Sequence, residues 1–315
     1  MLSFRPVPAE IIQVNEKIAV DLFVRKEDKL VPYLSKNSMY TDVNFSEISQ
    51  AGIKRFYVRG KDNKRLERYT TRHIDKILTN PNVPSKVKAN AFYLSSSQTM
   101  KHAFDDPRAE HLDEIKRSVK PMLKNIMKNE IILKDLFSIT QHDYYTYTHS
   151  VNVGIFATAL AVRYYINNGN KLDLNMEKLS YGYFLHDIGK SKIPLDILNK
   201  PGPLTEEEWV IMKMHPEWGY SILMETGHLT DEAAYIALEH HEQLNGSGYP
   251  FGKKNKDIHP CSRICAIADT FDALTSVRPY KDAISPYEAL RLMQKETIYD
   301  FDHHLLATFI KLLAP

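Results

Sequence analysis

The spacing of apolar residues differs between the beginning of the chain and the rest of it. Before residue 60, apolar and β-branched residues form short runs separated by turn-forming pairs such as Glu27-Asp28, and such runs are typical of strands. They predict strands at 17–24, 29–34 and 54–58 and one short helix at 45–51. We therefore expect residues 1–80 to form a small α/β domain.

Turn-forming residues follow this predicted domain. Pro81 and Pro84 stand among asparagine and serine residues, a composition that is typical of a domain boundary. Beyond them the apolar residues recur at helical spacing. We expect a linker and the start of a helical region at 81–110, and an all-helical domain at 111–315.

The predicted helical domain carries several helix signals. Leu112, Ile115 and Val119 lie on one helix face, and Pro121 is expected to end or kink that helix. Capping boxes are expected to start the helices after 204 and 284. The expected helices lie at 143–166, before 185, at 205–215, at 230–241, at 260–275 and after 285. The fold class is therefore α+β in two domains, with an all-helical bundle that carries the site.

Composition limits the class of protein. The apolar fraction is 43%, and no run of apolar residues approaches the roughly 18 that span a membrane. The start of the chain, MLSFRPVPAE, lacks the apolar core of a signal peptide. These features predict a cytoplasmic protein without a membrane span.

Charge is unevenly distributed, although the net charge is only +2. Residues 1–90 contain 17 Lys and Arg against 10 Asp and Glu, or +7, which leaves −5 for the remainder. Nine basic residues lie close together: Lys54, Arg55, Arg59, Lys61, Lys64, Arg65, Arg68, Arg72 and Lys76. Such a patch binds a partner or an anionic ligand, or it is only a solvated helix face. Nucleic acid is not expected as a partner, because no binding motif accompanies the charge.

Residue types that bind metals are concentrated between 181 and 281. Imidazole nitrogens and carboxylate oxygens together suit divalent first-row metals such as iron, manganese, nickel or zinc. Five histidines and two aspartates exceed the needs of one ion, and Asp187 beside His186 is the best candidate for a carboxylate shared by two ions. His149 lies upstream on an apolar helix face, where a histidine is more often a core residue than a ligand. The candidate metal ligands are His149, His186, Asp187, His215, His240, His241 and Asp269.

Three basic residues are candidates for contact with a phosphate group. Lys190 follows His186 by one helical turn, from where it can reach a phosphate oxygen or a leaving alkoxide. Arg278 and Lys281 follow the helix that carries Asp269, and an arginine fork beside a lysine charge makes a good clamp for phosphodiester oxygens. Each of them is alternatively an ordinary solvated side chain. Together with the metal ligands they indicate a metal-dependent hydrolase of phosphate esters.

Residues 143–300 resemble the HD-GYP subgroup of the HD phosphohydrolases. The motifs that carry the resemblance are His-Asp-Ile-Gly-Lys at 186–190, His-Pro-Glu-Trp-Gly at 215–219, His-His-Glu at 240–242, Gly-Ser-Gly-Tyr-Pro at 246–250 and Ala-Asp-Thr-Phe-Asp-Ala-Leu-Thr-Ser at 268–276. The resemblance implies an all-helical HD-type domain with phosphodiesterase activity on cyclic di-GMP, a bacterial second messenger. The product would be linear pGpG, and in some members GMP. The N-terminal region resembles, more loosely, the small accessory domain of some members and is expected to be regulatory.

The resemblance also implies a role for each site residue. One metal ion would be held by His149, His186, Asp187 and Asp269, and the other by Asp187, His215, His240 and His241. Lys190 would assist at the scissile phosphate, and Tyr249, Arg278 and Lys281 would contact the substrate. Asp187 and Lys190 are thus the expected catalytic residues. The cofactor is expected to be two divalent ions, with iron placed first and manganese, nickel and zinc as alternatives.

Two positions depart from the family pattern. Some members have a glutamate one helical turn before the first histidine ligand, where it helps to hold a third metal, but this chain has Tyr145. Two metals are therefore expected. The usual aspartate before the Gly-x-Gly-Tyr-Pro sequence is Asn245 here, and the lost charge can change the loop or its contacts without removing a metal ligand.

The same residues are compatible with other functions. A cyclic di-GMP receptor or interaction module would keep the metals but turn over little, and Asn245 is consistent with that. An HD hydrolase of another nucleotide would share the same ligands, because the shape of the pocket decides the choice of substrate. Protein partners, if present, are expected at the Gly-Tyr-Pro loop or at the basic N-terminal domain.

Overall fold

The chain divides into two compact units in a computed structural model that describes residues 3–128, 131–140, 146–167, 175–225, 227, 230–277, 282–295 and 300–314. The N-terminal unit comprises Met1–Ser96 and Asn129–Ile139, and the helical unit comprises Ser97–Lys128 and Thr140–Pro315. The domain limits expected at 80 and 110 stay predictions.

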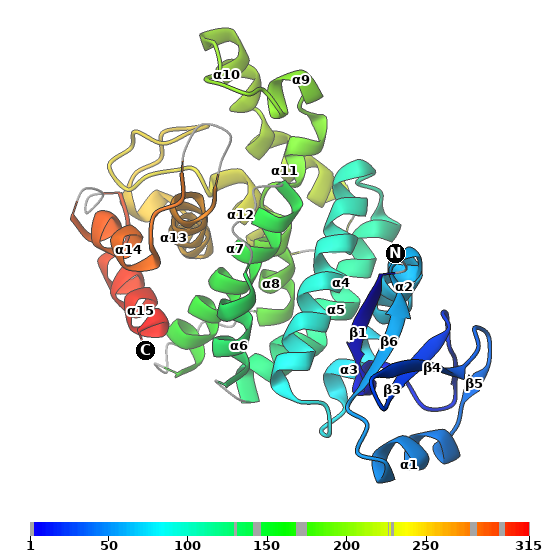
Figure 1. Cartoon of the computed structure of the whole chain (residues 1–315). Helices are drawn as coiled ribbons and strands as arrows, with labels where there is room; N and C mark the ends of the chain where they lie inside the picture. Colours follow the sequence, from blue (N-terminus) through cyan, green and yellow to red (C-terminus); the bar gives the residue numbers. More distant parts are fainter. Residues whose placement is uncertain are drawn as a thin grey trace. The chain divides into compact units, whose positions relative to one another are not determined.

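The N-terminal unit is built on an antiparallel sheet (Figure 1). Its strands are ordered β1 (Phe4–Pro8), β6 (Arg55–Arg59), β3 (Leu22–Lys26) and β4 (Lys29–Leu34), and a separate pair joins β2 (Glu16–Lys17) to β5 (Met39–Tyr40). Glu27 and Asp28 connect β3 to β4 with positive φ angles of 45° and 63°, as a tight hairpin requires. The predicted turn is confirmed.

Two predicted elements have different limits in the structure. The strand expected at 17–24 is interrupted between β2 and β3, where the Asp21 carboxylate accepts a hydrogen bond from the Lys36 backbone amide at 2.8 Å. The helix expected at 45–51 begins earlier, as α1 (Asp42–Gln50). Thr41 forms a capping box at its start, so the true N-cap lies upstream of the apolar residues on which the prediction relied.

The core of the N-terminal unit is apolar. The strands contribute buried side chains such as Leu22, Phe56 and Val58, and α2 (Asn63–Arg72) covers them with Leu66. The unit also contains η1 (Ala9–Ile11), η2 (Gly60–Asp62), α3 (Ile74–Thr79), the first part of α4 (Ser85–Asp105) and α6 (Ile131–Ile139). Burial of these side chains stabilises the unit.

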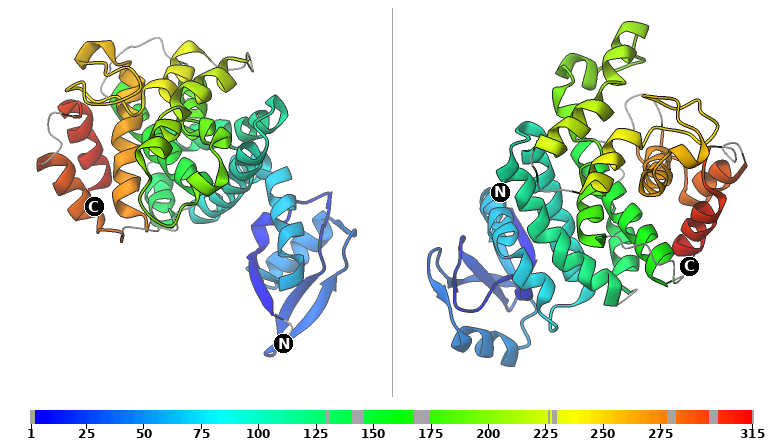
Figure 2. Two further views of the ribbon diagram at one scale, coloured as in Figure 1. Left: turned by 90° about the horizontal axis from the view of Figure 1, so that it is seen from above. Right: turned by 180° about the vertical axis from the view of Figure 1, so that it is seen from behind.

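The helical unit contains the remaining helices (Figures 1 and 2). They are the second part of α4, α5 (Ala109–Lys128), α7 (Thr146–Ala161), η3 (Val162–Asn167), α8 (Met176–Phe184), η4 (Ile188–Lys192), α9 (Leu195–Leu198), α10 (Glu206–Met212), α11 (His215–Glu225), α12 (Asp231–Glu239), η5 (Asn255–Asp257), α13 (Pro260–Thr275), α14 (Pro286–Lys295) and α15 (His303–Leu313). α13 packs against α7 and α12, and α8 packs against α7, α12 and α5. The expected fold class is confirmed. Within the described parts of the chain, every helix is too short or too polar to cross a bilayer.

Two helix ends expected near prolines of the helical unit are not present in the structure. Pro121 does not end its helix, because the buried residues Met122 and Leu123 continue the apolar face and α5 runs on to its end at residue 128. His215 was expected at the end of a helix, but it begins α11, and α10 ends before it. Pro216 therefore occupies the first turn of a helix, where its missing N–H leaves no hydrogen bond unmade.

Candidate metal centre

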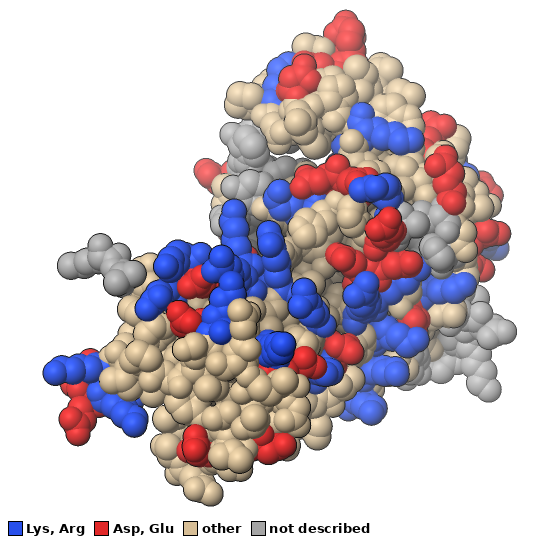
Figure 3. Space-filling model, turned by 90° about the vertical axis from the view of Figure 1, so that its right-hand side faces the viewer, with Lys and Arg blue, Asp and Glu red and all other residues tan. Residues whose placement is uncertain are grey.

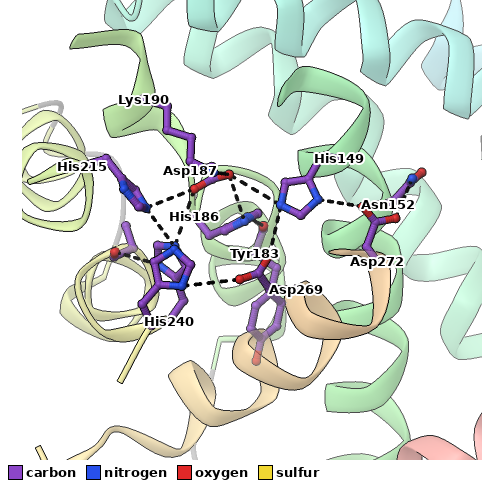
Figure 4. A network of polar contacts seen from close by, with 12 residues as sticks. His149, Asn152, Tyr183, His186, Asp187, Lys190, His215, His240, Asp269 and Asp272 are labelled. Atoms are coloured by element: carbon purple, nitrogen blue, oxygen red, sulfur yellow. Dashed lines mark hydrogen bonds and ion pairs between the residues drawn. The ribbon is translucent and has the colours of Figure 1, made fainter. Parts of the chain in front are cut away.

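The seven candidate ligands come from distant parts of the helical unit and meet in its interior (Figure 4). α7 supplies His149, the segment after α8 supplies His186 and Asp187, the start of α11 supplies His215, the end of α12 supplies His240 and His241, and α13 supplies Asp269. Their ligand atoms form two groups, and within each group the atoms lie within 4.8 Å of one another. One group is His149, His186 and Asp269, and the other is Asp187, His215, His240 and His241.

The Asp187 carboxylate lies between the two groups. Its Oδ2 atom is 3.6 Å from Nε2 of both His149 and His186. Its Oδ1 atom is 3.3 Å from Nε2 of His215 and 3.6 Å from Nε2 of His240. One oxygen is thus directed to each group, which is the arrangement that a carboxylate shared by two ions requires.

Backbone carbonyls orient three of the imidazole rings. Nδ1 lies 3.0 Å from the Tyr183 carbonyl in His186, 2.7 Å from the Met212 carbonyl in His215, and 2.9 Å from the Ala237 carbonyl in His240. Because a carbonyl oxygen only accepts, each Nδ1 carries the proton and donates it. The Nε2 atoms therefore direct lone pairs into the site, as metal-binding histidines do.

Among the described residues, these lone pairs face one another or lack a hydrogen-bond partner. Nε2 of His215 and Nε2 of His240 face each other at 3.3 Å, and Nε2 of His186 is buried without a hydrogen-bond partner in the described chain. Buried acceptors directed at one another are unfavourable unless a cation or proton lies between them. The donor set therefore fits divalent metal ions, and the expectation of a metal site is supported.

His149 is oriented by a carboxylate that sequence analysis did not single out. Its Nδ1 lies 2.7 Å from Oδ2 of Asp272, and the Asn152 side-chain amide donates to Oδ1 of Asp272 at 2.8 Å. Nε2 of His149 then faces Asp269 at 3.1 Å. Asp272 follows Asp269 by three residues and so shares its helix face, which was the signal available in the sequence.

Burial and charge set the protonation of the site. Burial opposes a charge on His149, but the carboxylates of Asp269 and Asp272 outweigh it and raise the pKa of His149 to about 10. Burial lowers the pKa of His186 to about 3, and it also lowers the pKa of His215. Neutral imidazoles are the form that binds metal, so His186 and His215 are already in that form, whereas His149 would release a proton when a metal binds.

Lys190 lies close to the proposed shared carboxylate. Its Nζ atom is 2.6 Å from Oδ2 of Asp187. Although burial opposes ionisation, Lys190 and the histidines hold the pKa of Asp187 well below its usual range. The His-Asp-x-Gly-Lys spacing therefore places a cation beside the metal ligands, as its sequence position suggested.

Gly189 allows this segment to approach α11. A Cβ atom at this position would lie 1.9 Å from the His215 carbonyl oxygen and 2.5 Å from the Gly219 nitrogen. Only glycine permits the contact between the two backbones. The approach brings Asp187 and His215 together from elements that are far apart in sequence.

A cavity of about 650 Å³ reaches the metal ligands. His240, His241 and Asp269 contribute to its lining, and so does Tyr249, whose ring stacks on His241 with centroids 4.6 Å apart. The buried Glu242 holds the loop beyond Tyr249, because its carboxylate accepts hydrogen bonds from two backbone amides at 2.7 and 2.9 Å. Arg278, Lys281 and Tyr145, which the sequence analysis singled out, lie outside the described residues.

Asn245 lies in the loop beside the cavity and has its own partner. Its amide donates a hydrogen bond to Oδ1 of Asp300 at 2.5 Å, and its carbonyl oxygen accepts from the Ser247 amide at 2.7 Å. An aspartate at this position would face the Asp300 carboxylate. The departure from the family pattern is therefore matched by a local contact and changes no candidate ligand.

The helical fold and its buried histidines and aspartates define a class of metal-binding domain. The family model for the HD domain matches residues 131–305, which is more than half of the chain, and the chain belongs to this family. It is 34% identical over 228 residues to the cyclic di-GMP phosphodiesterase PA4108 of Pseudomonas aeruginosa, covering 72% of this chain and 52% of that protein. It is 50% identical over 99 residues to the 3'3'-cGAMP-specific phosphodiesterase 2 of Vibrio cholerae, covering 31% of this chain and 19% of that protein.

A solved structure supports the fold along the whole chain. An HDG"Y"P protein from Bdellovibrio bacteriovorus superposes with a TM-score of 0.67 at 19% identity, covering 99% of both chains. At that level of identity the likeness concerns the fold alone. The chain spans about half, or less, of the length of the curated relatives that it matches.

Proposed function

We propose that this chain is a metal-dependent phosphodiesterase that hydrolyses cyclic di-GMP to linear pGpG. The alternative final product is GMP, formed by further hydrolysis of pGpG. The observation that supports this most is the position of Asp187, which directs one oxygen to each of two ligand groups. A cavity large enough for a nucleotide opens onto the same ligands. The printed name of the Pseudomonas relative supports the choice of substrate.

Each site residue has a role in this proposal. His149, His186, Asp187 and Asp269 hold one ion, and Asp187, His215, His240 and His241 hold the other. When bound, two divalent ions lower the pKa of water and screen the charge of a phosphodiester. Lys190 donates to a phosphate oxygen or to the leaving alkoxide. Tyr249, Arg278 and Lys281 contact the substrate.

The ions are proposed to be iron, with manganese, nickel and zinc as alternatives. The set of five imidazoles and two carboxylates suits all of them, because it combines nitrogen and oxygen donors. Which of these metals occupies a histidine-rich site depends partly on how much of each metal is available to the protein. Purification without oxygen is therefore part of any test.

The decisive experiment measures metal and products on one sample. Protein purified without oxygen is analysed for metal content and then mixed with cyclic di-GMP, and the products are separated by chromatography. We expect about two ions per chain, given two ligand groups, and pGpG as the first product. Full metal content without any product from cyclic di-GMP would contradict the proposal.

A second candidate substrate is 3'3'-cGAMP, which the name of the Vibrio relative favours. It carries one guanine and one adenine on the same cyclic phosphodiester backbone. The same chromatographic assay with this substrate compares the two through kcat/KM. Tight binding of either nucleotide without turnover would instead support the receptor function.

A basic face on the N-terminal unit supports a further partner (Figure 3). Lys64, Arg68 and Arg72 follow one another at intervals of four along α2, and all three are exposed. Arg65 is held by Asp62 at 2.9 Å. We infer an acidic protein as the partner of this face. Binding to poly-glutamate that weakens in Lys64→Glu/Arg68→Glu, with turnover unchanged, is the expected result.

A further inference from the structure

Helix α10 leaves its apolar residues outside any core. None of its described residues is buried, and Trp209 and Val210 are 45% and 66% exposed. A tryptophan in a soluble protein is normally largely buried, because its ring offers a large apolar area. α10 therefore has an apolar face that the described part of the protein leaves largely uncovered.

This face is directed into the cavity of the metal centre. Glu206, Trp209, Val210 and Lys213 all line the cavity, and their spacing of three, four and seven residues places them on one side of a helix. The other side of the cavity is formed by His240, His241 and Asp269. The uncovered face of α10 thus belongs to the same space as the metal ligands.

α10 is held in place by contacts outside the cavity. Thr205 and Glu208 form a capping box at its start, in which the Glu208 carboxylate accepts the Thr205 amide at 2.7 Å. Nζ of Lys200 lies 2.5 Å from the same carboxylate. These contacts fix the start of the helix and involve none of the residues that line the cavity.

The two sides of the cavity suit different parts of one ligand. Metal ligands on one side suit a phosphodiester. The indole of Trp209 on the other side offers a flat aromatic surface, on which any nucleobase can stack. The Glu206 carboxylate stands one helical turn before it and only accepts hydrogen bonds.

We propose that α10 forms a guanine subsite, in which Trp209 stacks on a base of the substrate and Glu206 accepts hydrogen bonds from its N1–H and N2–H2 groups. Adenine has no donor at N1 or C2, and its N1 lone pair would face the carboxylate. The subsite therefore selects guanine over adenine. This inference rests on the proposed function for the phosphodiester, but it assigns binding residues on a helix that supplies no metal ligand.

Fluorescence reports directly on the stacking. The chain contains two tryptophans, so Trp218→Phe leaves Trp209 as the single emitter in the metal-loaded protein. Rapid mixing with cyclic di-GMP, recorded before turnover, is expected to give saturable quenching. If Trp218→Phe does not fold, the difference between the wild type and Trp209→Phe supplies the same signal. Absence of quenching at concentrations that saturate turnover would overturn the proposal.

Substitution separates binding from chemistry. Trp209→Ala is expected to raise KM for cyclic di-GMP by about tenfold or more, as loss of base stacking does, with a much smaller change in kcat. Trp209→Phe retains most of the affinity. Met224→Ala, which removes another exposed apolar side chain away from the cavity, is the matched control. An unchanged KM in Trp209→Ala would mean that the face serves another occupant, such as a protein.

The carboxylate is tested by its selectivity. Glu206→Gln is expected to reduce the kcat/KM preference for cyclic di-GMP over cyclic di-AMP by about tenfold, since a good paired contact discriminates bases by that order. Glu207→Gln removes the same charge from the neighbouring residue, which does not line the cavity, and is expected to keep the preference. A preference that survives Glu206→Gln would overturn the assignment of this residue.

The subsite and the proposed hydrolysis fail in different ways. Saturable quenching without any product would support the guanine subsite and contradict the proposed phosphodiesterase activity. Normal turnover without quenching, and with no effect of Trp209→Ala, would contradict the subsite alone.

Discussion

Both units bury apolar side chains, but the helical unit also buries a cluster of histidines and aspartates. In the core of the N-terminal unit the most deeply buried side chains are apolar, as Leu22, Phe56 and Val58 show. In the helical unit His186 and Asp187 are equally buried, each with 0% exposure. Burial of charged and polar groups is unfavourable unless they are paired or bind a metal. The comparison teaches that apolar burial accounts for the first core, whereas the polar cluster inside the second fits a bound cation.

The largest effect is expected from the residue that lies between the two ligand groups. Because Asp187 directs an oxygen to each group, Asp187→Ala should remove most bound metal and all activity. Lys190→Ala should keep the metal and lose turnover, since its ammonium is proposed to contact the substrate. Metal analysis and product chromatography on both variants check this. Two ions retained in Asp187→Ala would refute the assignment of a shared ligand.

A core substitution in the N-terminal unit should have the opposite profile. Phe56 is fully buried in the sheet core, so Phe56→Ala should lower the free energy of unfolding of this unit by about 3–5 kcal/mol. Metal content should remain unchanged, because no candidate ligand lies in this unit. Hydrogen exchange measured peptide by peptide, with metal analysis of the same sample, separates the two units. Loss of metal in this variant would show that the cores are not independent.

A smaller loss of metal affinity is expected from substitution of Asp272, whose carboxylate contacts the candidate ligand His149. Asp272→Ala leaves Nδ1 of His149 without its partner at 2.7 Å, and such partners are typically worth about tenfold to a hundredfold in metal affinity. Competition with a chelator of known affinity measures the change. Asn152→Ala, which removes the 2.8 Å bond to the same carboxylate, should have a weaker effect. Equal effects of the two variants would show that Asp272 does not act through His149.

The smallest effect is expected at the loop. Asn245→Asp places a second carboxylate against Asp300, whose pKa is already raised by burial. At pH 7 the like charges should reduce stability by less than about 1 kcal/mol, as exposed charge pairs do. The loss should disappear as pH falls and the two carboxyls become protonated. Thermal unfolding at pH 7 and near pH 4 measures this, and a loss that grows on acidification would contradict it.

Local sequence patterns predicted which helices and strands form better than they predicted where these elements begin and end. The helix expected at 260–275 is α13, and the Ser285 capping box is present, with the Glu288 amide donating to the Ser285 hydroxyl at 3.2 Å. The start of α1 was missed because Thr41 precedes the apolar residues. Pro121 does not end α5, because burial of neighbouring residues outweighs the loss of one backbone hydrogen bond, and the alternative of a kink stays a prediction.

The ligand types and the family were readable from motifs, but the contacts around them were not. Spacing along a helix shows which residues share a face, and it cannot show which helix lies opposite. Asp272 was therefore not assigned a role, since its partner His149 is 123 residues away in sequence. The face of α10 was missed for the same reason, because exposure of Trp209 becomes meaningful only once the cavity is known.

The close approach at Gly189 indicates how a single mutation could inactivate a gene that encodes such a protein. Every other amino acid carries a Cβ, which at this position would meet the backbone of α11 at 1.9 Å. A gene copy with one altered codon here would still encode all seven candidate ligands and the lysine beside them. All ligand residues would be present in the sequence of such a copy, but the encoded protein could not bring them together. The glycine is therefore the better indicator of whether a related copy is still under selection for activity.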